Sequence, residues 1–147
     1  YENTDGFSET GWTQNASVRG FGWENMDVIS AGIQYKGINK LPLRVGYTYS
    51  SNPIPEEIAF FNIPATAIIK NSIMFGLSYE INQKFNLDAV YHHGASDGRT
   101  AGPLLNPMFV QNYPPNGAIP GSEVAYEMTT DMVMFGISYK FNARAQQ

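Results

Sequence analysis

The sequence predicts an all-β protein, an antiparallel up-and-down transmembrane β-barrel to which this chain contributes about five strands. Apolar residues alternate with small or polar residues over several segments of about ten residues. The connections between these segments are alternately short and long, and tyrosines fall near the segment ends. A strand with lipid on one face and an enclosed interior on the other requires this alternation.

The composition excludes several other classes of protein. The formal net charge is −4 and the basic residues form no stripe, so nucleic acid is not an expected partner. The absence of cysteine excludes disulfides, thiolate catalysis and zinc–thiolate sites. No apolar run reaches the roughly 18 residues of a spanning helix, so we expect strands to make any membrane crossing. Aromatic residues make up 14% of the chain, which suits two aromatic belts.

The chain is expected to divide into three parts. These are an N-terminal extracellular loop or upstream strand remnant (1–24), the C-terminal barrel-wall strands with two long extracellular loops at 51–71 and 94–127 (25–141), and a C-terminal tail (142–147). A poor strand is expected at 17–23. Because Tyr1 is preceded by neither an initiator Met nor an apolar leader, we expect that a signal peptide has been removed or that the chain is a fragment. An odd number of strands favours a fragment.

The first two wall strands are expected at residues 28–36 and 41–50, with the short polar turn 37–40 between them. The second strand has the clearest alternation. One of its faces carries Leu41, Leu43, Val45, Tyr47 and Tyr49, and the other carries Pro42, Arg44, Gly46, Thr48 and Ser50. We therefore expect the first set to face lipid and the second to face the barrel interior.

Three further wall strands are expected at residues 72–81, 85–93 and about 128–141. The turn at 82–84 is short, whereas the two long connections are rich in Pro, Gly and Asn. Short turns of outer-membrane barrels face the periplasm and long loops face outside, which fixes an orientation. Glycines recur on the interior face inside a loose hairpin repeat, where we interpret them as relieving crowding in a curved wall. They are Gly32, Gly46, Gly76 and Gly136.

The strand ends fit the dimensions of a membrane. A strand of about ten residues, tilted by about 40°, spans roughly 25 Å. Tyrosines near the short turns are Tyr35, Tyr79 and Tyr139, and those near the long connections are Tyr47, Tyr49 and Tyr91. No Lys or Arg falls on the apolar face at mid-strand, where it would cost about 2 to 4 kcal/mol. Asp27 and Asp131 fall on that face near the outer strand ends, where water or headgroups solvate them.

An ordered series of short motifs runs from Trp23 to Phe141. It comprises Trp23 with Asp27, followed by residues 30–35, 43–49, 52–55, 62–65, 76–79 and 136–141. In this order the motifs resemble the outer-membrane transporters of long-chain fatty acids and other hydrophobic compounds, the FadL and TodX type. The resemblance implies that the chain is the C-terminal part of a barrel of about fourteen strands in the bacterial outer membrane.

The resemblance also implies passive transport, with no catalysed reaction and no cofactor. Members of this family take up hydrophobic molecules through a barrel that an N-terminal hatch plugs, and release them through a lateral opening. Neither feature is visible in this sequence, so we expect the chain to supply part of the wall and two outer loops. Expected partners are fatty acids or aromatic hydrocarbons, outer-membrane lipid and lipopolysaccharide, and the barrel-assembly machinery. That machinery reads a terminal aromatic residue, whereas six residues follow Phe141 here.

Arg44 is the first candidate for ligand binding. A guanidinium that faces the interior can pair with a fatty-acid carboxylate through two hydrogen bonds. The alternative is a structural salt bridge in the wall, for which Asp88 or Glu80 would supply the carboxylate. Networks of this kind are common inside barrels, and we weigh the structural reading more heavily.

Two segments of the long loops are unusually apolar, residues 58–64 and 104–110. They are expected to capture hydrophobic ligands, dip into the lipopolysaccharide layer or form a joint outer groove. The candidate residues are Phe60, Phe61, Ile63, Leu105 and Phe109. The alternative is that these segments simply pack on their own barrel.

Catalysis and metal binding are not expected. His92 and His93 are adjacent on a strand, so their imidazoles point to opposite faces and cannot easily share one metal ion. The acidic loop residues that could bind divalent ions are Glu56, Glu57, Asp97 and Glu123. They lack the spacing of a calcium loop, so a solvated loop is the preferred interpretation.

Two other classes of function compete with transport. One is an outer-membrane scaffold or adhesin whose loops bind a partner while nothing passes through. The other is a soluble lipid-binding β-protein, which requires the apolar faces to meet in a closed core. Uptake of labelled oleate separates the first from a transporter, and extraction without detergent identifies the second.

Overall fold

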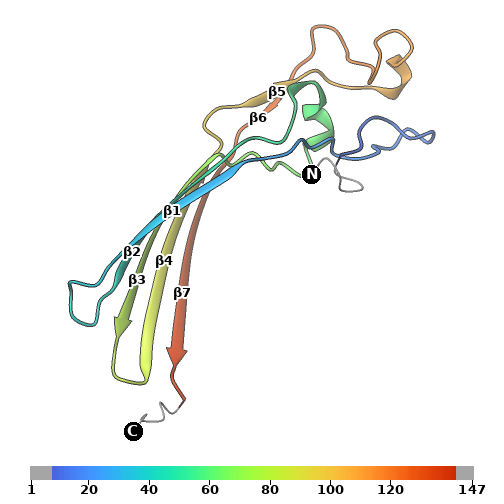
Figure 1. Ribbon diagram of the computed structural model, residues 1–147. Coiled ribbons are helices and arrows are strands. Elements are labelled where there is room, and N and C mark those ends of the chain that lie inside the picture. Colours follow the sequence, from blue (N-terminus) through green and yellow to red (C-terminus); the bar gives the residue numbers. More distant parts are fainter. Residues whose placement is uncertain (1–7, 142–147) are drawn as a thin grey trace. The chain divides into compact units, whose positions relative to one another are not determined.

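The computed structural model describes residues 8–141. Their elements are β1 (Val28–Tyr35), β2 (Leu43–Ser50), the 3-10 helix η1 (Glu56–Asn62), β3 (Asn71–Glu80), β4 (Phe85–Ala95), β5 (Thr100–Gly102), the 3-10 helix η2 (Pro107–Phe109), β6 (Val124–Tyr126) and β7 (Thr129–Tyr139) (Figure 1). No helix in this part of the chain is long and apolar enough to cross a membrane. The predicted tail at 142–147 and residues 1–7 lie outside the described residues.

The chain divides into two compact units. The sheet unit comprises residues 29–49, 71–94 and 129–141, and the loop unit comprises residues 8–28, 50–70 and 95–128. The sheet unit contains most of β1, β2, β3, β4 and β7, and the loop unit contains η1, β5, η2 and β6.

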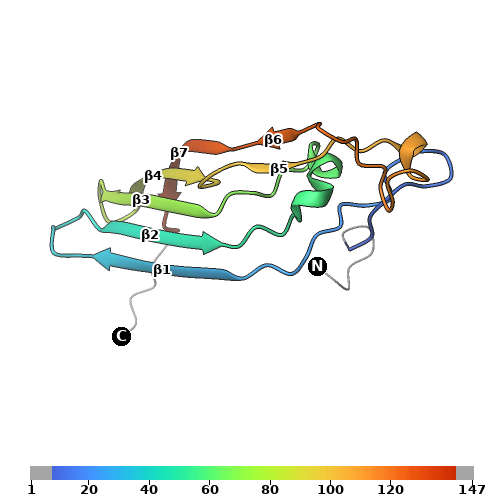
Figure 2. The same ribbon diagram turned by 90° about the horizontal axis from the view of Figure 1, so that it is seen from above.

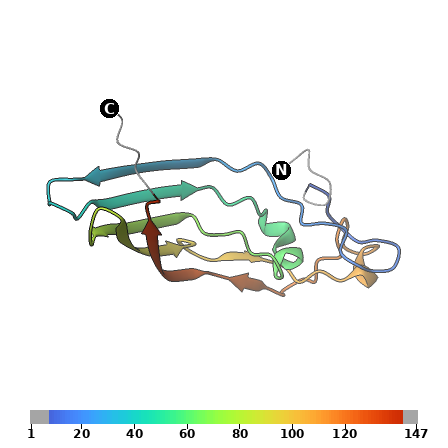
Figure 3. The ribbon, with the colours of Figure 1, turned by 90° about the horizontal axis from the view of Figure 1, so that it is seen from below.

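The large sheet has the strand order β1-β2-β3-β4-β7. Successive strands run in opposite directions, and the same order is visible from the opposite side (Figures 2 and 3). All five predicted wall strands are present within a few residues of their expected bounds. The all-β, antiparallel prediction is therefore confirmed. β1 and β7 form the two edges, and the described strands do not close into a barrel.

The register of β2 and β3 sorts side chains by polarity. Leu43 lies opposite Leu77 and Val45 opposite Phe75, whereas Arg44 lies opposite Gly76. Because neighbouring residues of a strand point to opposite sides, one side of the sheet is apolar and the other carries the recurrent glycines. We call these sides the apolar face and the glycine face.

The apolar face has no covering layer. The exposed fraction is 46% for Val45, 47% for Phe75 and 75% for Ile137, although each lies inside a strand. A water-soluble sheet buries such a face against a helix or a second sheet. This apolar row is therefore exposed, as the predicted contact with lipid requires.

The loop unit has a small core of its own. Ile58, Phe61 and Leu105 are buried together, and Trp12, Phe60 and Ala118 pack against them. The backbone of β5 approaches η1 so closely that a Cβ atom on Gly102 would lie 1.8 Å from the carbonyl oxygen of Glu56. The poor strand expected at 17–23 is not formed, since Val18 makes only an isolated bridge to Trp12.

Candidate functional site

A chain of hydrogen bonds crosses the glycine face of four neighbouring strands. Arg44 on β2 donates from Nη1 to the hydroxyl oxygen of Ser78 on β3 at 3.0 Å. Ser78 in turn donates to Oδ1 of Asp88 on β4. Ser138 on β7 donates to the other carboxylate oxygen of Asp88 at 3.3 Å. We call these four residues the polar ladder.

The polar ladder modifies the salt bridge that the sequence suggested for Arg44. Arg44 and Asp88 are joined through the buried Ser78 hydroxyl rather than by a direct ion pair. A hydroxyl donates one hydrogen bond and accepts others, so Ser78 satisfies both charged groups at once. The Arg44 side chain itself is exposed on the glycine face.

Beside the polar ladder, three glycines leave a hollow on the glycine face, because glycine has no side chain to fill the space. Gly32, Gly46 and Gly76 lie on the adjacent strands β1, β2 and β3. The hollow has a volume of about 360 Å³ and is lined also by Arg44, Met74 and Val90. We call it the glycine-face hollow, and it combines apolar walls with one guanidinium.

The three glycines make this hollow because they lack side chains and need no special backbone conformation. A Cβ atom on Gly46 would lie 3.6 Å from Met74 Cε, and one on Gly76 would lie 3.6 Å from Arg44 Cβ, both ordinary contacts. A small side chain would therefore fit, whereas a large one would fill the space. Substitution of these glycines by larger residues should therefore reduce the volume of the hollow.

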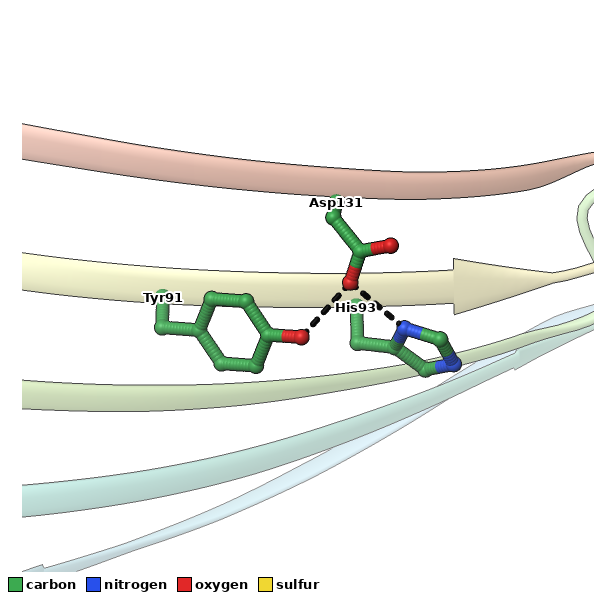
Figure 4. A network of polar contacts seen from close by, with 3 residues as sticks. All are labelled: Tyr91, His93 and Asp131. Carbon is green, nitrogen blue, oxygen red and sulfur yellow. Dashed lines mark hydrogen bonds and ion pairs between the residues drawn. The ribbon is translucent and has the colours of Figure 1, made fainter.

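The two histidines lie on opposite faces, as their adjacency predicts. His93 Nδ1 lies 2.8 Å from Oδ1 of Asp131, on the apolar face (Figure 4). Nδ1 of His92 is buried and has no hydrogen-bond partner among the described residues. No group of three His, Asp or Glu side chains within residues 8–141 is placed to hold a metal ion.

The candidate residues in the loops have two different environments. Phe61 and Leu105 are almost fully buried, with exposed fractions of 2% and 4%, and Phe60 packs against them. Ile63 and Phe109 are exposed, with fractions of 49% and 41%. The two long loops thus share one core, and the exposed pair remains available for contact with a ligand.

Asn62, which was not among the candidate residues, is fully buried in the loop unit. Its side-chain oxygen accepts from Trp23 Nε1 at 2.5 Å. Its amide nitrogen donates to the carbonyl oxygens of Phe21 at 2.8 Å and Ile58 at 3.1 Å. Asn62 thereby fastens the N-terminal segment to η1, and only its place within an apolar segment could have indicated this role.

Other polar groups of the loop unit also have structural partners. Tyr126 donates to the carbonyl oxygen of Ala59 at 3.2 Å, and burial raises the pKa of its phenol. The acidic loop residue Glu123 accepts a hydrogen bond from Arg99. Such an exposed ion pair stabilises a fold by about 0 to 1 kcal/mol.

Comparison with known proteins identifies one family. The family model of the outer membrane protein transport protein (OMPP1/FadL/TodX) matches residues 7–143. No curated protein and no solved structure matches the chain.

Proposed function

The chain belongs to the outer membrane protein transport family (OMPP1/FadL/TodX), and from this premise we propose that it takes part in passive transport of long-chain fatty acids or other hydrophobic compounds. In this proposal the sheet unit is a stretch of barrel wall and the loop unit is an outer structure that solutes meet first. One observation carries it. An uncovered apolar face lies back to back with a face that holds a hollow and a guanidinium.

The exposed apolar face supports placement of the sheet in lipid. Transfer of apolar surface from water into hydrocarbon stabilises by about 25 cal/mol for each Å². Exposed tyrosines lie on this face at both ends of the strands, where their rings suit the membrane interfaces. They are Tyr35, Tyr79 and Tyr139 at the short-turn ends and Tyr47, Tyr49 and Tyr91 at the long-loop ends.

The glycine-face hollow supports a role in guiding the solute. Its lining offers apolar contact to a hydrocarbon chain, while Arg44 offers hydrogen bonds to a carboxylate. No covalent step is required of these residues. Selectivity would come from the shape of the hollow and from the single positive charge.

The exposed loop residues Ile63 and Phe109 are proposed as the first contacts for a hydrophobic solute. Phe60, Phe61 and Leu105 hold the loop unit together and shape its surface from within. This division assigns a capture role to two of the five apolar candidates and a supporting role to three.

Uptake of labelled oleate by cells that express the full protein tests the proposal. Gly46→Leu fills the glycine-face hollow and is expected to lower the uptake rate several-fold. Gly136→Leu is the matched control, because it lies on the same face of β7 and does not line the hollow. Equal rates for both variants at equal surface amounts would contradict the proposed path.

A second comparison separates the two readings of Arg44. Arg44→Gln removes the charge but keeps a donor, so recognition of a carboxylate predicts slower uptake of oleate and unchanged uptake of toluene. A purely structural role in the polar ladder predicts equal losses for both solutes, accompanied by a lower unfolding midpoint.

A further inference from the structure

Ser78 separates the two charged groups of the polar ladder. Its hydroxyl oxygen accepts from Arg44 Nη1 at 3.0 Å, and its proton is donated to Oδ1 of Asp88. Within the described residues, Arg44 and Asp88 are joined only through this hydroxyl. A direct contact between a guanidinium and a carboxylate commonly makes two parallel hydrogen bonds. The sheet therefore keeps apart two groups whose chemistry favours a direct pair.

The three groups fix the direction of these hydrogen bonds. A guanidinium only donates and an ionised carboxylate only accepts, whereas a hydroxyl has one proton to donate. The proton of Ser78 therefore points to Asp88, and its oxygen receives a proton of Arg44. Ser78 is 7% exposed, so water has little access to replace either partner. Ser138 donates to Asp88 Oδ2 and holds the carboxylate from the side of β7.

Arg44 retains most of its donors in this arrangement. A guanidinium has five N–H groups. Within residues 8–141, the guanidinium of Arg44 donates one hydrogen bond, from Nη1. The Arg44 side chain is exposed, and it lines the glycine-face hollow together with Met74 and Val90. Its remaining N–H groups can therefore donate to a ligand in the hollow.

A direct pair between Arg44 and Asp88 would remove this capacity. Two donors would be used at once, and a neighbouring negative charge would match the positive one. We propose that Ser78 is a positioning residue, which holds the Arg44 guanidinium away from Asp88 and keeps it available for the carboxylate of a fatty acid. This inference rests on the proposed function, because it requires the glycine-face hollow to receive the solute.

The chemistry of the hollow defines the class of solute. Its volume of about 360 Å³ is at the lower end of the range for ligand pockets, which suits part of a single hydrocarbon chain. One guanidinium suits one carboxylate. The expected solute is therefore a monocarboxylic acid with one chain. An alcohol with the same chain keeps the apolar contacts and lacks the charge-assisted hydrogen bonds, so it is the matched probe.

Uptake kinetics of cells that express the full protein test this role of Ser78. Labelled oleate and labelled oleyl alcohol are supplied separately, and the half-saturating concentration is measured for each. Ser78→Ala removes the spacer and lets Arg44 pair directly with Asp88. We expect the half-saturating concentration of oleate to rise about tenfold, as for the loss of one hydrogen bond to a charged group, and that of oleyl alcohol to stay unchanged.

Two further variants separate positioning from a purely structural role. Ser78→Thr keeps the hydroxyl and is expected to keep the oleate value of the unmodified protein. In the Asp88→Asn background, Arg44 has no carboxylate to pair with, so Ser78→Ala is expected to change the oleate value by less than about twofold. A loss of packing or stability alone would affect both probes and would persist in this background.

Ser30→Ala is the matched control. The Ser30 hydroxyl lies on the glycine face and is hydrogen-bonded to Thr48 at 2.9 Å, but Ser30 neither lines the hollow nor contacts the polar ladder. This variant removes a hydroxyl from the same face and is expected to leave the uptake of both probes unchanged.

Equal changes for oleate and oleyl alcohol in Ser78→Ala would overturn the proposal. A tenfold effect of Ser78→Ala that persists in the Asp88→Asn background would also overturn it. The unmodified protein distinguishes this inference from the proposed function. Uptake of neither probe refutes transport itself, whereas normal uptake of both that Ser78→Ala leaves unchanged refutes only the positioning role.

Discussion

The loop unit buries a core of large apolar side chains, whereas the described part of the sheet unit buries none. Phe61 in the loop unit is 2% exposed and packs edge to face on Trp12, with ring centroids 5.0 Å apart. Phe135 in the sheet unit is 77% exposed. The loop unit thus has a core of its own, whereas the sheet unit leaves an apolar face uncovered, as contact with hydrocarbon would require. Two segments of equal hydrophobicity can therefore be buried to different extents, because burial depends on whether water or lipid surrounds the segment.

The largest expected effect is in the loop core. Phe61→Ala removes a buried ring and is expected to destabilise the loop unit by about 3 to 5 kcal/mol. Limited proteolysis of the full protein should show faster cleavage within residues 51–71 and 94–127. Phe135→Ala should leave these loops as resistant as in the unmodified protein. Equal resistance in both variants would remove the contrast between the two units.

The next effect concerns the two faces of β3. Phe75→Arg places a charge on the apolar face and is expected to cost about 2 to 4 kcal/mol in a bilayer. Met74→Arg, at the adjacent residue, is expected to cost much less because its side chain lies on the glycine face, opposite the apolar face. Urea unfolding of the full protein in lipid vesicles measures both. Similar losses for the two variants would contradict the assignment of the faces.

A smaller effect is expected in the polar ladder. Ser78→Ala removes the hydroxyl that joins Arg44 and Asp88, and leaves a half-buried carboxylate with fewer partners. We expect a loss of about 1 to 3 kcal/mol in the free energy of unfolding. Ser138→Ala removes only the longer, exposed contact and should cost less. A larger loss of unfolding free energy in Ser138→Ala than in Ser78→Ala would show that Asp88 is held mainly by its hydrogen bond to β7.

The smallest effect on stability is expected at the exposed loop residues. Ile63→Ser and Phe109→Ser should change the free energy of unfolding by less than about 0.5 kcal/mol, since neither side chain is buried. If these residues capture solute, the rate of oleate uptake should fall at low solute concentration. Unchanged uptake in the double variant would leave them without a role in capture.

Much of the sheet was predictable because its alternation is a local signal. The strand at Leu43–Ser50 and its partner at Asn71–Glu80 follow from period-two patterning, and their register matches apolar residues across the pair. The strands β5 and β6 have three residues each, which is too short for an alternation of apolar and polar residues to be recognised.

The contacts that define the sites depend on distant residues, and the sequence alone could not pair them. Asp131 was noted as a charge on an apolar face, but its partners Tyr91 and His93 are 40 and 38 positions away. Likewise, Arg44 was expected to need a carboxylate, and the intervening Ser78 became visible only through the register of β2 and β3.

The glycine-face hollow shares part of its lining with a second hollow, of about 320 Å³, on the apolar face. Arg44, Val45, Gly76 and Val90 contribute to both, so at this point one layer of backbone separates them. In the proposed transport function, a shift of these strands would change the space open to a solute and the surface open to lipid at the same time.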